Sequence, residues 1–148
     1  MMLFFLEGSY PDLQGRYLSD IWSFTDEKIE KTHDFIQWVF PLDEPSNAVW
    51  DAPVLIQEEI EEIRISNKAK ENLIKSQNWF LQYIMKNDDW IRPKNHNQRR
   101  ISRMIKSLRL LHSNEAAVHS FGSVVGLATE RNFVNESVIN YWKDCSCF

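Results

Sequence analysis

The spacing of apolar residues along the chain predicts helices. The first stripe has four members that recur at helical intervals and would share one face: Ile29, His33, Ile36 and Phe40. Pro41 ends this predicted helix, because a proline disfavours helical backbone at the residue before it. Ser23 or Thr25 is the expected N-cap, since short polar side chains there accept hydrogen bonds from the first turn.

Similar stripes predict further helices in the rest of the chain. They begin near Leu55 or Gln57, at Ser66 or Asn67 (ending at about Met85), at Asn95 or Asn97, and at Asn114, and a short last helix covers 136–142. Their apolar faces carry Ile60 and Ile63; Leu73, Gln77, Phe80 and Ile84; Ile101, Met104, Ile105 and Leu108; and Ala117, Phe121, Val124 and Ala128. Residues 87–97 have the composition of a loop. Because no stretch alternates as a strand would, the predicted fold is all-α, a single-domain bundle of five to six helices over residues 1–148.

The most distinctive segment is HDFIQWVFP, residues 33–41. His33 has two interpretations: a functional base or proton relay on a partly buried face, or a core histidine whose ring bonds to a backbone carbonyl and to a neighbour such as Gln37. Trp38 lies nearly opposite His33 on a helical wheel, so this helix is apolar on two sides. Such a helix belongs at the centre of a bundle, which favours the core interpretation and predicts a largely buried His33.

The chain is rich in aromatic residues for its length. Of its 148 residues 13% are aromatic, and six are tryptophan. This excess predicts a bulky core or an aromatic-lined groove. Five tryptophans are candidates for such a groove: Trp22, Trp38, Trp50, Trp79 and Trp90.

Charge is distributed unevenly, although the net charge is only −4. Residues 20–62 contain twelve acids and two lysines, a net charge of −10, whereas residues 92–109 contain seven bases and no acid, a net charge of +7. Arg100 lies at the edge of the apolar face of its predicted helix. We expect Arg100 and Arg103 to pair with carboxylates of the acidic segment, such as Asp34, Asp43 or Glu44.

Three bases form an outward stripe on the same predicted helix: Arg99, Arg103 and Lys106. Such a stripe can track the phosphates of RNA or DNA, with Trp90 and His96 in the preceding loop available to stack on bases. More often a charged outer face is only solvated, and a pI of 5.6 lacks the basic character of nucleic-acid-binding domains. Nucleic-acid binding is therefore the alternative hypothesis.

The sequence contains no motif for catalysis or for a bound metal or cofactor. It has no Gly-rich phosphate loop, no G-x-S-x-G and no H-E-x-x-H. His112 and Glu115 are spaced like half of a metal site, but the second half is missing. We therefore expect no enzyme activity, no metal and no cofactor.

The cysteines and the chain ends favour a cytoplasmic or otherwise intracellular protein that is not secreted. Cys145 and Cys147 are too close to the C-terminus to staple the body of the fold. The apolar run in the N-terminal MMLFFLEG is too short for a signal peptide or a transmembrane segment. The terminal CSCF formally fits a C-a-a-X prenylation motif, but its middle residues are not aliphatic, so lipidation is not expected.

Two blocks of sequence stand out together. The first is IWSFTDEKIEKT with HDFIQWVFP and EPSNAVWDAP, and the second is HNQRRISRMIKSLRLL. In this combination the chain resembles the conserved N-terminal region of the opioid growth factor receptor family, over about residues 22–111. The matching positions are His33, Ile36, Gln37, Trp38, Phe40 and Pro41, and then His96, Asn97, Arg100, Arg103, Ser107 and Leu108. Gln98 and Arg99 depart from the family pattern, which predicts a more exposed start of that helix.

The resemblance implies a receptor-like role in peptide binding, because animal members of the family bind the pentapeptide Met-enkephalin and restrain cell proliferation at the nucleus. By resemblance, the candidate binding residues are His33, Gln37, Trp38, His96, Asn97, Arg100 and Arg103. The leading hypothesis is a non-enzymatic helical domain that accepts a short peptide or protein segment in an aromatic groove. The alternative is a nucleic-acid-associated module that uses the basic helix 99–109, with Arg99, Arg103 and Lys106 on phosphates.

Overall fold

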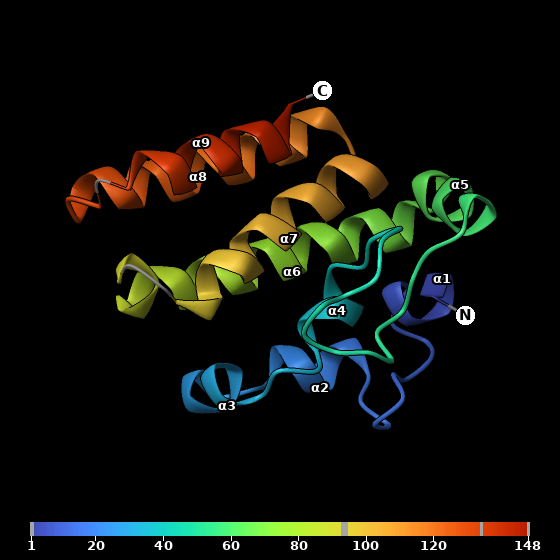
Figure 1. The fold of residues 1–148 in the computed structure, drawn as a ribbon. Helices are drawn as coiled ribbons and strands as arrows, with labels where there is room; N and C mark the ends of the chain where they lie inside the picture. Colours follow the sequence, from blue (N-terminus) through green and yellow to red (C-terminus); the bar gives the residue numbers. More distant parts are fainter. Residues whose placement is uncertain (1, 93–94, 134, 148) are drawn as a thin grey trace. The chain divides into compact units, whose positions relative to one another are not determined.

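The computed structural model describes residues 2–92, 95–133 and 135–147. Contacts between residues divide the chain into two compact units, Met1–Ser76 and Gln77–Phe148, and the boundary falls within helix α6 (Asn67–Lys86). In the described ranges the regular structure is helical, apart from one isolated bridge between Leu42 and Val54 (Figure 1). The predicted all-α fold is confirmed, whereas a single domain over residues 1–148 stays a prediction.

The N-terminal unit contains short helices before α6. They are α1 (Met2–Leu6), α2 (Leu18–Trp22), α3 (Asp26–Lys31), α4 (Ile36–Val39) and α5 (Gln57–Ile65). All but α5 span four to six residues, too few for the helical period to repeat, so spacing predicted fewer helices than the described residues form. The longer α5 begins where predicted, with Ile60 and Ile63 buried.

The predicted continuous helix that ends at Pro41 is wrong, because two helices replace it. The first, α3, begins after the N-cap Thr25, whose hydroxyl accepts a hydrogen bond from the Lys28 N–H at 3.2 Å, as expected for that residue type. The backbone turns extended at Thr32, and α4 begins only at Ile36.

The predicted burial of His33 is wrong for the same reason. Ile29, Ile36 and Phe40 are buried as predicted, but His33 lies in the linker between α3 and α4 and is exposed. Residues of a helical stripe share a face only while the helix is continuous. In extended backbone successive side chains alternate in direction, so the helical spacing no longer applies.

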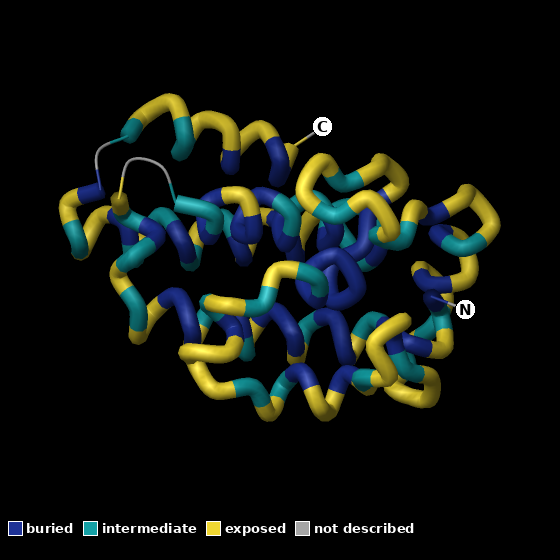
Figure 2. Tube along the Cα trace, turned by 60° about the horizontal axis from the view of Figure 1, so that its bottom comes forward, coloured by how far each residue is buried: buried dark blue, intermediate teal, exposed yellow. Residues whose placement is uncertain are grey.

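Residues 35–42 form the centre of the N-terminal unit. Every residue of this run is buried, and the run contains the single turn of α4 (Figure 2). Trp38 meets the ring of Phe5 edge-on, with centroids 5.4 Å apart, and Phe35 meets Phe24 in the same way at 5.6 Å. The core interpretation of this segment therefore holds for residues 35–41.

Helix α1 ends in a Schellman motif that returns the chain toward α6. The N–H groups of Gly8 and Ser9 donate to the carbonyls of Phe5 and Phe4, each at 2.9 Å. Gly8 has φ +85°, a conformation that a residue with a Cβ rarely adopts. The buried amide of Asn72 in α6 then donates to the last carbonyl of α1 at 2.8 Å, which fixes α1 against α6.

The C-terminal unit is built around α7. It contains the 3₁₀ turn η1 (Asp89–Ile91), α7 (His96–Leu111), α8 (Asn114–Glu130) and α9 (Glu136–Ser146), and α7 packs against the other three. The N-termini of α7 and α8 are both capped by a side chain. The Asn95 side chain accepts from the Asn97 N–H at 2.9 Å, and the Ser113 hydroxyl accepts from the Ala116 N–H at 3.1 Å.

Gln98 links three elements of this unit. Its side-chain Nε2 donates to the backbone carbonyls of Trp90 at 2.8 Å and Arg92 at 2.7 Å. Its backbone carbonyl accepts a hydrogen bond from the Trp142 indole at 3.2 Å. The expectation of an exposed helix start is therefore wrong for Gln98, which is buried, and correct for Arg99. Backbone carbonyls inside a protein need hydrogen-bond donors, and the Gln98 amide donates to two such carbonyls.

We expect Trp38→Ala to lower the free energy of unfolding by about 3–5 kcal/mol, because it leaves a cavity beside Phe5 in the core. His33→Ala is expected to lower it by about 1 kcal/mol or less, since the residue is exposed. Urea denaturation followed by circular dichroism gives both midpoints. Equal shifts for the two variants would contradict the linker placement of His33.

Candidate functional site

Most residues of the block 33–41 belong to the buried core of the N-terminal unit. Gln37 is buried, and its Nε2 donates to the backbone carbonyl of His33 at 3.2 Å. Trp38 is buried as well. Of these three candidate binding residues, only His33 is exposed to a ligand from solvent, so the block has the character of a structural element.

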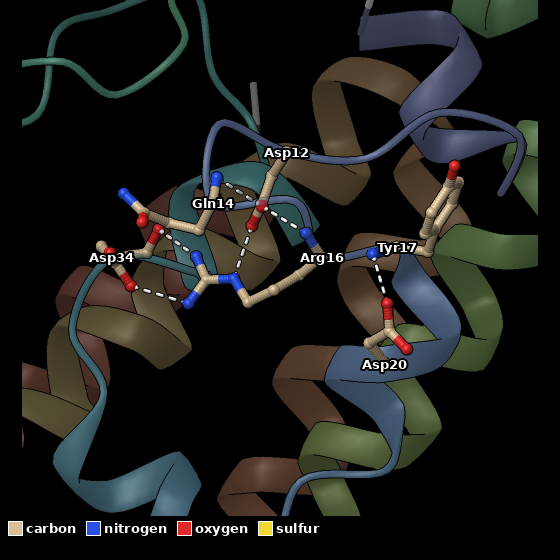
Figure 3. A network of polar contacts seen from close by, with 6 residues as sticks. All are labelled: Asp12, Gln14, Arg16, Tyr17, Asp20 and Asp34. Atoms are coloured by element: carbon tan, nitrogen blue, oxygen red, sulfur yellow. Dashed lines mark hydrogen bonds and ion pairs between the residues drawn. The ribbon is translucent and has the colours of Figure 1, made fainter.

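A charged network holds the linker that precedes α4 (Figure 3). Arg16 Nε donates to Asp12 Oδ2 at 2.8 Å, and its Nη1 donates to Asp34 Oδ1 at 3.0 Å. Its Nη2 also donates to the backbone carbonyl of Asp34 at 3.3 Å. The Asp12 side chain is 0% exposed, so Arg16 connects a buried carboxylate to the linker.

The loop that carries Asp12 and Arg16 is a tight turn. Asp12 Oδ1 accepts from the N–H groups of Gln14 and Arg16, each at 2.9 Å, and the Gly15 N–H donates to the Asp12 carbonyl at 3.0 Å. Gly15 has φ +78°, which favours glycine. Sequence reasoning missed this network: the Asp and Gly of PDLQGR indicate a turn, but local spacing does not identify Asp34 as the partner.

The second block places two of its candidate residues inside the C-terminal unit. Asn97 and Arg100 are buried, and Arg100 Nη1 donates to Asn97 Oδ1 at 3.2 Å. His96 and Arg103 are partly exposed. The expected pairing of Arg100 and Arg103 with carboxylates of the acidic segment stays a prediction, and Lys94 of the basic segment lies outside the described residues.

The outward basic stripe is confirmed at Arg99, which is exposed. Arg103 and Lys106 are only partly exposed. The Lys106 ammonium lies 5.4 Å from the centroid of the Tyr141 ring of α9, in a cation–π contact. A phosphate would therefore compete with Tyr141 for Lys106.

Residues 43–54 form a closed loop that we call the acidic loop. At its base the Leu55 N–H donates to the carbonyl of Leu42 at 2.9 Å, and both leucines are buried. Within it, the Ser46 hydroxyl accepts from the N–H groups of Ala48 and Val49, each at 3.2 Å. Compact loops closed in this way are frequently functional.

A turn presents Trp50 at the surface of the acidic loop. The Ala52 N–H donates to the Val49 carbonyl at 3.2 Å, so Trp50 and Asp51 occupy the two central positions of the turn. Trp50 is 94% exposed, and Asp43 and Asp51 are exposed too. Sequence reasoning named Trp50 as one of five groove candidates and included it in the first family block, but did not predict its exposure on a turn.

The five candidate tryptophans differ in their exposure to solvent. Trp38 and Trp90 are buried, and Trp22 donates from its indole to the Ser76 hydroxyl at 2.9 Å. Trp22 and Trp79 are partly exposed. The expected groove is therefore wrong in its membership, because Trp38 and Trp90 are buried, and Trp50 alone of the five is fully exposed.

The described residues contain no group of three or more His, Cys, Asp and Glu side chains that could hold a metal ion. No helix within the same ranges has both the length and the apolar character that crossing a membrane requires.

Cys145, the cysteine at the first position of CSCF, lies in α9 and is 3% exposed, whereas Cys147 is exposed. Burial raises the pKa of the Cys145 thiol. Phe148 of the same motif lies outside the described residues.

A family model matches more than half of the chain. The model, described as the opioid growth factor receptor (OGFr) conserved region, matches residues 10–89. This range includes Asp12, Arg16, the block 33–41 and the acidic loop. It begins before Trp22 and ends before His96, so the second block lies outside it.

Curated relatives carry the same name as the family model. The opioid growth factor receptor of Homo sapiens is 26% identical over 155 residues, which cover 86% of this chain and 22% of the relative. That of Rattus norvegicus is 34% identical over 65 residues, which cover 42% of this chain and 11% of the relative. The chain thus spans about a fifth or less of the length of these relatives. No solved structure matches the chain.

Asp12→Ala is expected to lower the free energy of unfolding by about 2–4 kcal/mol, because it leaves Arg16 and two backbone N–H groups without their buried acceptor. The matched control is Glu27→Ala, which removes an exposed ion pair with Lys31 and is expected to cost about 0–1 kcal/mol. Urea midpoints at neutral pH compare the two. Similar midpoints would show that the Arg16 network is not structural.

The two cysteines are expected to react at different rates. A raised pKa means that at any given pH less of the Cys145 thiol is in the reactive thiolate form, and burial also restricts access to it. Iodoacetamide should therefore label Cys147 faster than Cys145 in the folded protein, and both equally in urea. Peptide mapping by mass spectrometry measures the two rates. Faster labelling of Cys145 in the folded state would refute its burial in α9.

Proposed function

This chain belongs to the opioid growth factor receptor family, and from that membership we propose that it is a non-enzymatic binding domain for a short peptide or protein segment. The relatives are named as receptors for an opioid growth factor, and their activity comes to this chain only as part of the proposal. The family match includes the acidic loop, so the proposed binding surface lies within the shared region.

The exposure of Trp50 is the observation that carries this proposal. An indole of this size favours burial by a few kcal/mol, yet Trp50 is 94% exposed at the tip of a hydrogen-bonded turn. Tryptophan is the residue type most enriched among side chains that dominate binding energy at protein interfaces. A partner that covered Trp50 would remove this apolar surface from water.

Two further apolar side chains are exposed in or directly after the acidic loop. Val54 in the acidic loop and Ile56 just after it are also exposed. By contrast, the candidate residues Gln37, Trp38 and Asn97 are buried and support the fold instead. The acidic loop, which contains the EPSNAVWDAP part of the first family block, is thus a better binding surface than the candidate residues in HDFIQWVFP and in the second block.

Nucleic-acid binding through α7 is the alternative, and the exposure of Arg99 favours it. It has less support, because Lys106 lies over the Tyr141 ring and the pI is 5.6. Salt separates the two functions. Phosphate contacts lose affinity steeply between about 50 and 200 mM salt, and a contact dominated by a buried indole loses less.

The proposal predicts saturable peptide binding that depends on Trp50. Met-enkephalin and a random short-peptide library are the probes, and binding is followed by calorimetry and by tryptophan fluorescence. Trp50→Ala should weaken any ligand found by about tenfold or more, because the main apolar contact is lost. If neither probe shows saturable binding, and the protein instead binds a single-stranded RNA in a way that Arg99→Ala abolishes, the alternative replaces the proposal.

A further inference from the structure

We propose that the acidic loop recognises a positively charged segment of a partner protein, with a Lys or Arg side chain over the face of the Trp50 indole. Carboxylates of the loop would pair with that base and its neighbours. This inference rests on the proposed function and names the chemical class of its ligand.

The Trp50 ring is available for such a contact. It is 94% exposed, and among the described residues it has no hydrogen-bond partner and no ring or cation–π contact. Both faces of the indole therefore meet solvent. Tryptophan is also the aromatic side chain that attracts cations most strongly.

Hydrogen bonds order the backbone that carries this ring before any partner arrives. The Ala52–Val49 hydrogen bond closes the turn, the Ser46 hydroxyl fixes the preceding backbone, and the Leu42–Leu55 hydrogen bond closes the base. Pre-ordering a binding loop reduces the conformational entropy that association would otherwise cost. An exposed tryptophan on an ordered turn is therefore a more effective anchor than one on a flexible chain.

Charge decides which partner fits. Between Lys31 and Arg64 the sequence has eight carboxylates and no Lys or Arg, and three of the acids lie in the loop itself: Asp43, Glu44 and Asp51. Among the described residues none forms an ion pair with Asp43 or Asp51. An anionic partner would be repelled, and a neutral apolar one would desolvate these carboxylates without pairing them. A basic segment would place a cation over the Trp50 ring and would also supply charged partners for the carboxylates.

The exposed aliphatic side chains suit the same partner. Lys and Arg carry long apolar stems that pack along apolar surface while the charged head stays in water. Val54 and Ile56, four and six residues after Trp50, expose such surface. The chain already uses cation–π contacts internally, with Lys28 Nζ 4.8 Å from the centroid of the Phe24 ring.

The test measures how two blocked synthetic peptides bind to the full chain at physiological salt, where long-range attraction between exposed charges is largely screened. One peptide alternates Lys and Arg with Gly, and the matched peptide carries Gln in place of every Lys and Arg. Calorimetry and tryptophan fluorescence should show saturable binding of the basic peptide and none of the Gln peptide. Binding of both with equal affinity would overturn the cationic class while leaving peptide binding itself intact.

Variants of Trp50 separate a cation–π contact from simple apolar burial. We expect Trp50→Phe to weaken binding of the basic peptide by about two- to fivefold, and Trp50→Leu by about tenfold or more, because leucine keeps apolar surface but has no π face. Wild-type affinity in Trp50→Leu would overturn the proposal. Trp50 is exposed, so unchanged urea midpoints confirm that each variant is folded.

Charge variants test whether the loop acids act locally. Asp43→Asn with Asp51→Asn should weaken binding of the basic peptide several-fold, whereas Glu71→Gln with Glu130→Gln, which removes the same charge from exposed positions outside the loop, should not. Equal losses in the two double variants would indicate unspecific attraction to an acidic protein and refute the site. No binding of the basic peptide, with a library ligand still bound, would reject the cationic class alone.

Discussion

A helix of one turn that is buried on every side is the feature on which the N-terminal unit depends. Residues 35–42 around α4 are all buried, so the backbone groups at their ends need partners from the protein rather than from water. Before the run, the Gln37 amide and the Arg16 guanidinium donate to the carbonyls of His33 and Asp34 and so hold the linker that enters the helix. After the helix, the Leu55 N–H donates to the carbonyl of Leu42. Hydrogen bonds therefore hold the chain both where it enters this buried run and where it leaves it.

The same requirement determines where the candidate binding surface lies. Because Leu42 and Leu55 are held together in the core, the twelve residues between them must leave the core and return to the same place. A chain that returns over so short a path has to turn, and the turn carries Trp50 outward. The acidic loop thus begins and ends in the core that contains α4, and the family match includes both elements.

The C-terminal unit also depends on polar groups placed inside it. Gln98 donates to two carbonyls around η1, and Arg100 donates to Asn97 within α7. In the same unit the buried amide of Gln77 donates to the Ser120 hydroxyl at 2.7 Å. Buried polar groups of this kind favour one arrangement of the helices, because any other arrangement would leave donors and acceptors unpaired. In both units, side chains that a hydropathy pattern assigns to the surface organise the interior.

Local spacing and capping chemistry in the sequence determined the all-α class and the helices α5 to α8 with most of their apolar faces. The sequence also placed the start of α9, but ended that helix at Trp142 rather than Ser146, and it left two candidates for each N-cap, of which the structure selects Thr25 and Asn95. These features depend on residues within a few helical turns of one another, so short stretches of sequence are enough to predict them. The break before α4, the exposure of His33 and Trp50, and the pairing of Arg16 with Asp34 were decided only by the tertiary structure. Each of them depends on which buried group needs a partner from a distant part of the chain, and a helical period contains no information about that.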